Sequence, residues 1–241
     1  MSRRAVLVVT CEHGGNEVPA EYAAAFAEAR DALESHRGYD PGTLELAGEF
    51  AAALAASLHV ATVSRLVVEL NRSPRHRALF SEFTRVLPRE ARADLLARYY
   101  RPYRDAVEAH IGETIGEGNG DAIALHVSVH SFSPVMNGVE RRADVGLLYD
   151  PRRPLEREYC GRRRDALMQH QGDLIVRRNY PYRGVADGLV THLRRRFAAD
   201  RYVGVELEVN QKHPLAGGAA WARLKETLIQ TLAMISRTTA P

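Results

Sequence analysis

The alternation of short apolar runs with longer helical segments is the feature that most constrains how this 241-residue chain can fold. Strands are predicted at residues 5–10, 61–70, 122–129, 145–149, 174–178 and 202–209. Helices are predicted at residues 19–33, 44–58, 90–115, 154–171 and 219–236. Apolar strands that alternate with helices form a sheet covered on both faces, so the pattern predicts an α/β fold. No linker, repeat or low-complexity segment divides the sequence, and we expect a single domain over residues 1–241.

The charged residues argue against nucleic acid as a partner. The net charge is only +3, although 31 of the 33 basic residues are arginines. The arginine runs at 162–164 and 194–196 are expected to be solvated helix faces, because no aromatic residues alternate with them to stack on bases. The many guanidinium groups are nevertheless well suited to binding carboxylates through two parallel hydrogen bonds.

The sequence also disfavours a membrane or an exported location. No apolar run approaches the roughly 18 residues that a membrane span requires. The basic start, Met1 to Arg4, precedes an apolar run that is too short for a signal peptide. Cys11 and Cys160 form neither a CxxC pair nor a disulfide framework. We therefore expect a protein of the reducing cytoplasm.

Ionisable side chains gather at the C-terminal ends of four predicted strands, where open α/β sheets place their ligand sites. These residues are Glu12 and His13, then Glu69, Asn71 and Arg72, then His126 and His130, and finally Glu206 and Glu208. Packing alone does not readily explain four such strand ends in one chain. We therefore expect the ends to meet in one functional site.

Histidines and carboxylates in this arrangement indicate a mononuclear zinc site, which needs three protein ligands and one open position. Such an ion activates water and polarises a carbonyl group, while a free carboxylate transfers the proton. The residues alone are compatible with several ligand sets. Each set contains His13, either His130 or His126, and one carboxylate. Glu208 is the natural general base. The candidate carboxylates are Glu12, Glu17, Asp40 and Glu69.

Other catalytic classes have less support. Cys11 next to His13 is a weaker candidate for a thiolate nucleophile, since a small apolar residue that closes a strand explains it better. The sequence contains no HExxH, GxSxG, GxxxxGK[ST] or GxGxxG motif.

Six short motifs follow one another along the chain: CEHGG at 11–15, ELNRS at 69–73, YYRPYRDAV at 99–107, HSF at 130–132, YRGVADG at 182–188 and ELEVNQ at 206–211. Together they resemble the N-formylglutamate amidohydrolase family, zinc-dependent hydrolases related in fold to zinc carboxypeptidases. The resemblance extends from about residue 7 to residue 211 and implies a mixed, mostly parallel sheet sandwiched by helices, as in zinc-dependent exopeptidases.

The resemblance also implies roles for individual residues. His13, Asp40 and His130 correspond to the ligands of one zinc ion, and Glu208 corresponds to the general base and acid. Glu12, Glu69, His126 and Glu206 would then surround the site or replace one of these residues. We expect Asn71, Arg72 and Arg183 to hold the carboxylates of the substrate, because arginine is the best receptor for them.

The sequence therefore predicts a metal-dependent hydrolase that cleaves the amide of a small, acidic N-acyl amino acid such as N-formyl-L-glutamate. One alternative is a metal-dependent carboxypeptidase or cell-wall peptide amidase, although a secreted enzyme would normally carry an export signal. The other is a metal-free carboxylate-binding module in which His13 and His130 donate hydrogen bonds.

Overall fold

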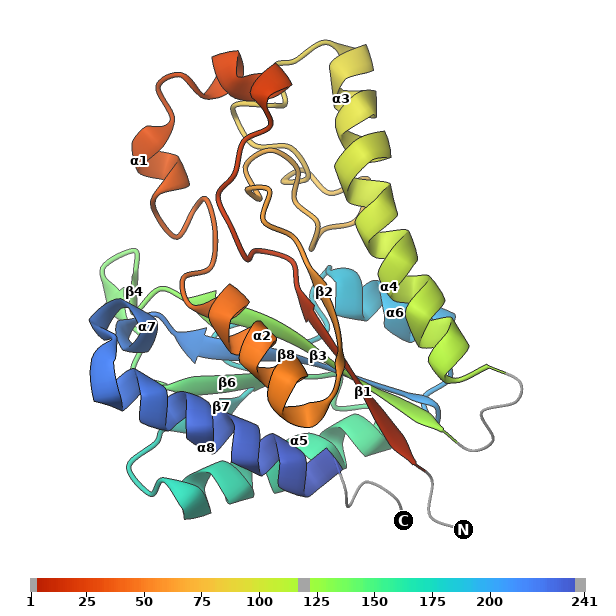
Figure 1. Ribbon diagram of the computed structural model, residues 1–241, viewed down its shortest axis with the longest axis vertical. Coiled ribbons are helices and arrows are strands. Elements are labelled where there is room, and N and C mark those ends of the chain that lie inside the picture. The colour runs from red at the N-terminus through yellow and green to blue at the C-terminus, as the bar shows by residue number, and fades with distance from the viewer. Residues whose placement is uncertain (1–3, 117–121, 237–241) are drawn as a thin grey trace.

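The computed structural model describes residues 4–116 and 122–236, and the basic start at Met1 to Arg3 lies outside them (Figure 1). Its centre is a six-stranded sheet in the order β2-β1-β3-β8-β6-β7. These strands are β2 (Ser57–Val60), β1 (Ala5–Cys11), β3 (Ile123–Phe132), β8 (Tyr202–Asn210), β6 (Val145–Leu148) and β7 (Val176–Arg178). The first four strands are parallel, whereas β6 is antiparallel to β8 and parallel to β7. The prediction of a mixed, mostly parallel sheet is thus confirmed.

Helices cover both faces of the sheet, which confirms the predicted α/β class (Figure 1). On one face lie α2 (Thr43–Leu54), α5 (Pro154–His170) and α8 (Gly218–Ser236). Their apolar side chains and those of the central strands form the largest hydrophobic cluster. On the other face α4 (Arg101–Thr114) and α6 (Leu189–Arg196) enclose a smaller cluster.

The face of the sheet beneath α4 and α6 changes from apolar to polar along the strands. Its beginning is apolar, with Val8 and Ala124 in the smaller cluster. His126 follows and hydrogen-bonds Thr10 Oγ1 through Nε2 at 2.9 Å and the Tyr202 hydroxyl through Nδ1 at 2.7 Å. Because side chains alternate along a strand, residues 128 and 130 of β3 and residues 206 and 208 of β8 continue this polar row. The row ends at the C-terminal edge of the sheet.

A second group of segments lies beyond that edge, at the top of Figure 1. It consists of the 3-10 helix η1 (Ala20–Phe26), α1 (Arg30–Leu33), the loop at 61–88, α3 (Arg89–Leu95) and the π-helical turn η2 (Leu96–Tyr100). These segments have two hydrophobic clusters of their own, which include Phe26, Leu66, Val67, Leu79 and Leu95. The helix predicted at 90–115 is present as α3, η2 and α4, with the π-helical turn just before Pro102. The remaining elements are the hairpin of β4 (Val135–Met136) and β5 (Val139–Glu140), and α7 (Lys212–Ala216).

The strand predicted at 61–70 is wrong. The strand that pairs with β1 is β2, which ends at Val60, just before the predicted strand. The chain then leaves the sheet in a series of turns. Leu66 and Val67 pack into the hydrophobic cluster beyond the sheet edge, so their apolar character serves a loop core rather than a strand. A short apolar run does not by itself distinguish these two outcomes.

Two predicted helices also differ in extent. The helix predicted at 44–58 ends at Leu54, because Ala55 adopts a left-handed conformation with φ of 49° that terminates α2. The helix predicted at 19–33 is divided into η1 and α1, separated by residues 27–29.

The expectation that both arginine runs are solvated is wrong for one arginine in each run. Arg163 is only 2% exposed, and its Nη2 donates to the carbonyl oxygen of Leu228 at 2.6 Å. Arg194 pairs with the fully buried Glu156 through Nε at 3.0 Å and also donates to the carbonyl oxygen of Gly204. Both arginines therefore connect elements of the fold.

None of the described helices combines the length and apolarity needed to span a bilayer.

Candidate active site

Three buried side chains meet at the C-terminal edge of the sheet. His13 lies in the turn after β1, His130 lies near the end of β3, and Asp40 lies in the loop before α2. Asp40 Oδ2 is 3.3 Å from His13 Nδ1 and 3.1 Å from His130 Nδ1. The backbone of Asp40 is held in place because its N–H donates to the carbonyl oxygen of His13 at 2.9 Å. These three residues form a group that can hold a metal ion.

The opposite nitrogen of each histidine is held by a second carboxylate. His13 Nε2 lies 2.5 Å from Glu69 Oε1, and His130 Nε2 lies 3.0 Å from Glu12 Oε2. In a neutral histidine, a carboxylate beside Nε2 favours the tautomer that is protonated there, and this tautomer has its Nδ1 lone pair facing Asp40. Glu69 and Glu12 therefore lie on the outer sides of the two rings rather than between them.

Glu12 is itself anchored at both oxygens. The Ser128 hydroxyl donates to Glu12 Oε2 at 2.6 Å, and the Tyr103 hydroxyl donates to Oε1 at 3.0 Å. Burial raises the pKa of the Glu12 carboxyl, but its interactions with His130 and the hydrogen bond from Ser128 lower the pKa more, so it is ionised. This fixed anion determines how the His130 ring is oriented.

The other groups of the cluster are held in their charged forms as well. Burial opposes charge at Asp40 and at Glu69, yet His13 and Arg65 together keep the pKa of both carboxyls below the usual values. Burial also disfavours a charged His130, but hydrogen bonds with Asp40 and Glu12 raise its pKa well above the ordinary value. The cluster thus attracts positive charge strongly.

Glu208 lies beside this cluster and differs from the other carboxylates. It is paired in register with His130 across the parallel strands β3 and β8 and is 5% exposed. Burial raises the pKa of Glu208 to about 8, because the charge of His130 compensates only in part. Within the described ranges, Glu208 Oε2 has no hydrogen-bond partner. Glu206 lies two residues earlier on the same face, and burial raises its pKa too.

Gly146 leaves the space that Glu208 occupies. It is paired with Glu208 across β6 and β8, and a Cβ at this position would overlap the Tyr180 carbonyl oxygen and lie 3.2 Å from Glu208 Cβ. We expect Gly146→Ala to destabilise the fold by about 1–3 kcal/mol, as overpacking typically does. Thermal or urea unfolding measures this loss. Gly161→Ala in α5 is the control, because its Cβ would meet nothing within 4 Å; equal stability of the two variants would contradict the prediction.

Arg65 is a site residue that the sequence did not single out. Its Nη1 donates to Asp40 Oδ1 at 3.2 Å, and its Nε donates to Glu69 Oε2 at 2.8 Å. One guanidinium thus connects the carboxylate between the histidines with the carboxylate behind His13. No motif distinguished Arg65 from the other arginines, because its position in a loop next to the cluster appears only in three dimensions.

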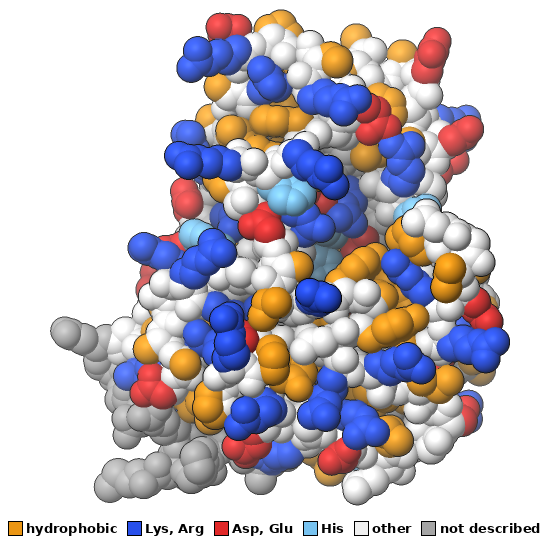
Figure 2. All heavy atoms as spheres, turned by 180° about the vertical axis from the view of Figure 1, so that it is seen from behind, with side chains coloured by type: hydrophobic (Ala, Val, Ile, Leu, Met, Phe, Trp, Pro, Cys, Tyr) orange, Lys and Arg blue, Asp and Glu red, His pale blue; other side chains and the backbone are white. Residues whose placement is uncertain are grey.

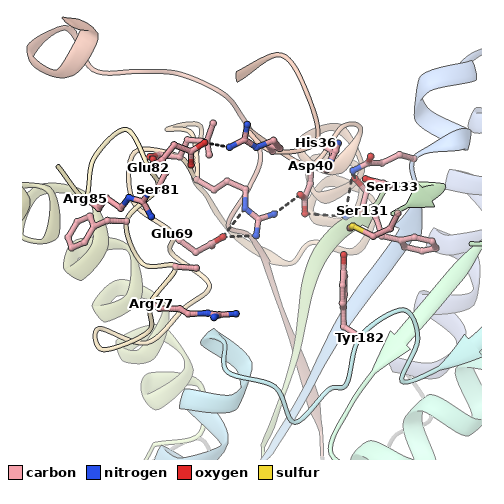
Figure 3. A pocket seen from close by; sticks show the side chains of 18 residues that line it. His36, Asp40, Glu69, Arg77, Ser81, Glu82, Arg85, Ser131, Ser133 and Tyr182 are labelled. Atoms are coloured by element: carbon pink, nitrogen blue, oxygen red, sulfur yellow. Dashed lines mark hydrogen bonds and ion pairs between the residues drawn. The ribbon is translucent and has the colours of Figure 1, made fainter. Parts of the chain in front are cut away.

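A cavity of about 600 Å³ adjoins the cluster. Asp40, Glu69, Arg65 and Ser131 form the wall next to the two histidines, and Figure 3 shows Asp40 and Glu69 in this wall. The remaining walls include the basic residues His36, Arg37, Arg77 and Arg85, the acidic Glu82, and the polar residues Ser133, Tyr182 and Gln211. Figure 2 shows blue Lys and Arg side chains around a hollow on this side of the molecule. The cavity suits a small anionic molecule.

The three residues expected to bind substrate, Asn71, Arg72 and Arg183, do not lie together in the cavity wall. Asn71 is buried, accepts a hydrogen bond from the Leu189 N–H at 2.7 Å and has its Nδ2 3.4 Å from His130 Nε2. Arg72 donates to the carbonyl oxygens of Asn71 and Asp187, so its guanidinium joins two loops. Arg183 is exposed and does not belong to the cavity wall. Arg77 and Tyr182 line the cavity instead; Tyr182 opens the YRGVADG motif, whereas no sequence signal distinguished Arg77.

The remaining alternatives are also located. His126 lies deeper in the sheet between Thr10 and Tyr202, where burial lowers its pKa to about 4. Glu17 lies away from the histidines and accepts a hydrogen bond from the Thr62 hydroxyl at 2.8 Å. Cys11 is fully buried, and burial raises the pKa of its thiol to about 12, which argues against a thiolate nucleophile.

A sheet of this type, with a His–Asp–His cluster at its C-terminal edge beside an open cavity, is an arrangement typical of metal-dependent hydrolases. Sequence comparison identifies the class more closely. The model of the N-formylglutamate amidohydrolase family matches residues 5–213, and the chain belongs to this family. The protein is therefore an amidohydrolase. Comparison with curated proteins gave no match.

Two solved structures show the same fold. The crystal structure of gene product Atu2144 from Agrobacterium tumefaciens matches with a TM-score of 0.75 and 27% identity, over 95% of this chain and 91% of that one. N-formylglutamate amidohydrolase from Ralstonia eutropha JMP134 matches with a TM-score of 0.66 and 18% identity, over 98% and 96%. A metallo-carboxypeptidase from Burkholderia cenocepacia is more distant, with a TM-score of 0.46 and 14% identity over 99% of this chain and 58% of that one.

Proposed function

We propose that this amidohydrolase uses one zinc ion, held by His13, Asp40 and His130, to cleave the amide of an N-acyl amino acid such as N-formyl-L-glutamate. The observation that carries the proposal is the spacing of the donor atoms. Tetrahedral zinc with bonds of about 2.0–2.1 Å places neighbouring donors about 3.3 Å apart. Asp40 Oδ2 lies 3.3 Å and 3.1 Å from the two Nδ1 atoms, and one ligand atom of each of the three residues lies within 4.8 Å of the others, which supports such an ion.

The charges around the cluster support a divalent cation. Glu12, Asp40 and Glu69 are ionised, while Arg65 provides a single positive charge. Two negative charges therefore remain to be balanced in a buried region, where unpaired charge is costly. One zinc ion with two neutral histidines balances them. The metal-free alternative requires both histidines to carry an additional proton.

The bound ion would supply Lewis-acid activation of water and of the scissile carbonyl. Glu208 accepts the proton of the attacking water through its unpartnered carboxylate oxygen and delivers it to the leaving nitrogen. Its raised pKa suits this exchange, because a group that both accepts and releases a proton works best with a pKa near the working pH. Glu12 and Glu69 keep the two histidine rings oriented toward the ion.

The cavity supports a small, anionic substrate. Its basic lining fits the carboxylates of an N-acyl amino acid better than a neutral polymer. Cys11 and Cys160 are free and buried, which fits action in the cytoplasm. Both features favour a small-molecule hydrolase over a cell-wall amidase.

Metal analysis combined with a substrate panel tests this function. The purified protein is expected to contain about one zinc ion per chain, and chelation should abolish hydrolysis of N-formyl-L-glutamate until zinc is restored. A C-terminal dipeptide and a muramoyl-peptide serve as competing substrates. Faster cleavage of either one would favour the corresponding alternative, and full activity without metal would refute the zinc proposal.

The outer carboxylates give a more specific prediction. We expect Glu12→Gln and Glu69→Gln each to weaken zinc binding by about 10- to 100-fold, because each removes the charge that orients one histidine ring. A competition titration with a zinc-sensitive chelator measures the affinity. Glu17→Gln is the matched control, since Glu17 pairs with Thr62 outside the cluster. Unchanged affinity in both outer variants would contradict an orienting role.

A further inference from the structure

Arg77 differs from the other arginines of the cavity wall. These arginines are Arg37, Arg65, Arg77 and Arg85. Arg37 forms an ion pair with Glu82, and the charge of Arg85 acts on the same carboxylate. Arg65 forms ion pairs with Asp40 of the cluster and with Glu69, which lies behind His13. Arg77 alone pairs with no carboxylate in the part of the chain that the structure describes, and Figure 3 shows its guanidinium pointing into the cavity.

Tyr182 offers a second hydrogen-bond donor to the same space. Arg141 Nη1 donates to the Tyr182 hydroxyl oxygen at 3.2 Å, and the Arg141 guanidinium lies 5.2 Å from the centre of the Tyr182 ring. Because the oxygen accepts this hydrogen bond, the O–H hydrogen remains for an acceptor in the cavity, and no described residue supplies one. In Figure 3 the hydroxyl group points into the cavity, with Arg77 on the facing wall.

We propose that Arg77, assisted by Tyr182, binds the side-chain carboxylate of the substrate and thereby selects N-acyl amino acids with acidic side chains. The inference rests on the proposed function. Figure 3 shows Arg77 across the cavity from Asp40, so a substrate whose amide lies next to Asp40 has room to extend its side-chain carboxylate toward Arg77. A guanidinium binds a carboxylate through two parallel charge-assisted hydrogen bonds, which a neutral amide side chain does not reproduce.

The test compares an acid with its neutral isostere. N-formyl-L-glutamate and N-formyl-L-glutamine differ only in the side-chain group that Arg77 would bind. We expect Arg77→Ala to lower kcat/KM for the acid by about 10- to 100-fold, mainly through KM, and to leave the value for the amide unchanged. Tyr182→Phe is expected to cause a smaller loss, about 3- to 10-fold, also only for the acid.

Two controls accompany these variants. Arg75→Ala removes an exposed arginine of the same loop that does not line the cavity, and its preference for the acid should match that of the wild type. The zinc content of Arg77→Ala should also equal that of the wild type, since Arg77 does not contact the metal cluster. An Arg77→Ala enzyme that keeps the wild-type ratio of acid to amide hydrolysis would overturn the inference while the proposed function stands.

Binding of glutarate separates the inference from the proposed function. If the wild type cleaves neither formyl compound, the proposed function fails, and calorimetric titration with glutarate still tests the carboxylate site. Glutarate binding that Arg77→Ala abolishes and Arg75→Ala retains supports the inference. Equal binding by the wild type and Arg77→Ala, or no binding by the wild type, overturns it.

Discussion

Replacing either histidine of the cluster by alanine is expected to release the metal. His13→Ala and His130→Ala each remove one of the three proposed ligands. The two ligands that remain are fewer than the three that a catalytic zinc site requires. We expect zinc content to fall from about one ion per chain to a trace, with loss of hydrolysis. Elemental analysis after dialysis against a weak chelator measures the content directly.

His170→Ala is the matched control, because His170 is an exposed histidine at the end of α5 and is not one of the three clustered residues that could hold a metal ion. His126→Ala addresses the other histidine of β3, which hydrogen-bonds Thr10 and Tyr202, and it should lose stability while keeping its metal. Retention of zinc by His130→Ala together with its loss in His126→Ala would show that the ligand had been assigned to the wrong histidine.

Replacing Glu208 by glutamine should separate catalysis from metal binding. Glu208→Gln preserves the shape of the side chain but removes the carboxylate that accepts the proton of water. We expect the variant to retain zinc and to lose at least about 10²-fold in kcat, the usual contribution of general acid–base catalysis. Because Glu208 is buried and Oε2 has no hydrogen-bond partner among the described residues, the neutral amide should not cost much folding stability.

The outcomes for Glu208→Gln discriminate between roles. Loss of zinc together with activity would make Glu208 a ligand, and the base would then have to be another carboxylate. A turnover close to that of the wild type would exclude both roles and leave Glu69, which lies 2.5 Å from His13 Nε2, as the next candidate. Glu206→Gln is the paired variant, since Glu206 lies on the same face of β8 two residues earlier, and we expect a smaller effect on kcat.

The sequence by itself was sufficient for the class of fold and for the family. Apolar runs such as those of β1, β3 and β8 are bounded by turns and alternate with helical segments, and this local pattern is enough to predict a sheet covered on both faces. The order of the short motifs was enough for the family, which the family model confirms over residues 5–213. Both inferences depend on neighbouring residues or on their order along the chain.

The tertiary structure decided which side chains meet. Spacing along the strand did not distinguish His126 from His130, which share a face of β3. The family resemblance implied His130, and the partners of each ring show that His130 is the one that adjoins Asp40. Glu69 was expected at the end of a strand, yet it reaches His13 from a loop, because the apolar residues before it pack beyond the sheet edge.

The arginines illustrate the same limit. Arg72 and Arg183 belong to recognisable motifs, but Arg72 joins two loops and Arg183 is exposed, whereas Arg65 and Arg77 line the cavity without any motif. All of them have the same side chain, so neither composition nor spacing along the chain reveals which guanidinium is paired and which is free. That difference depends on contacts between residues distant in sequence, and these contacts exist only once the loop at 61–88 has folded over the end of the sheet.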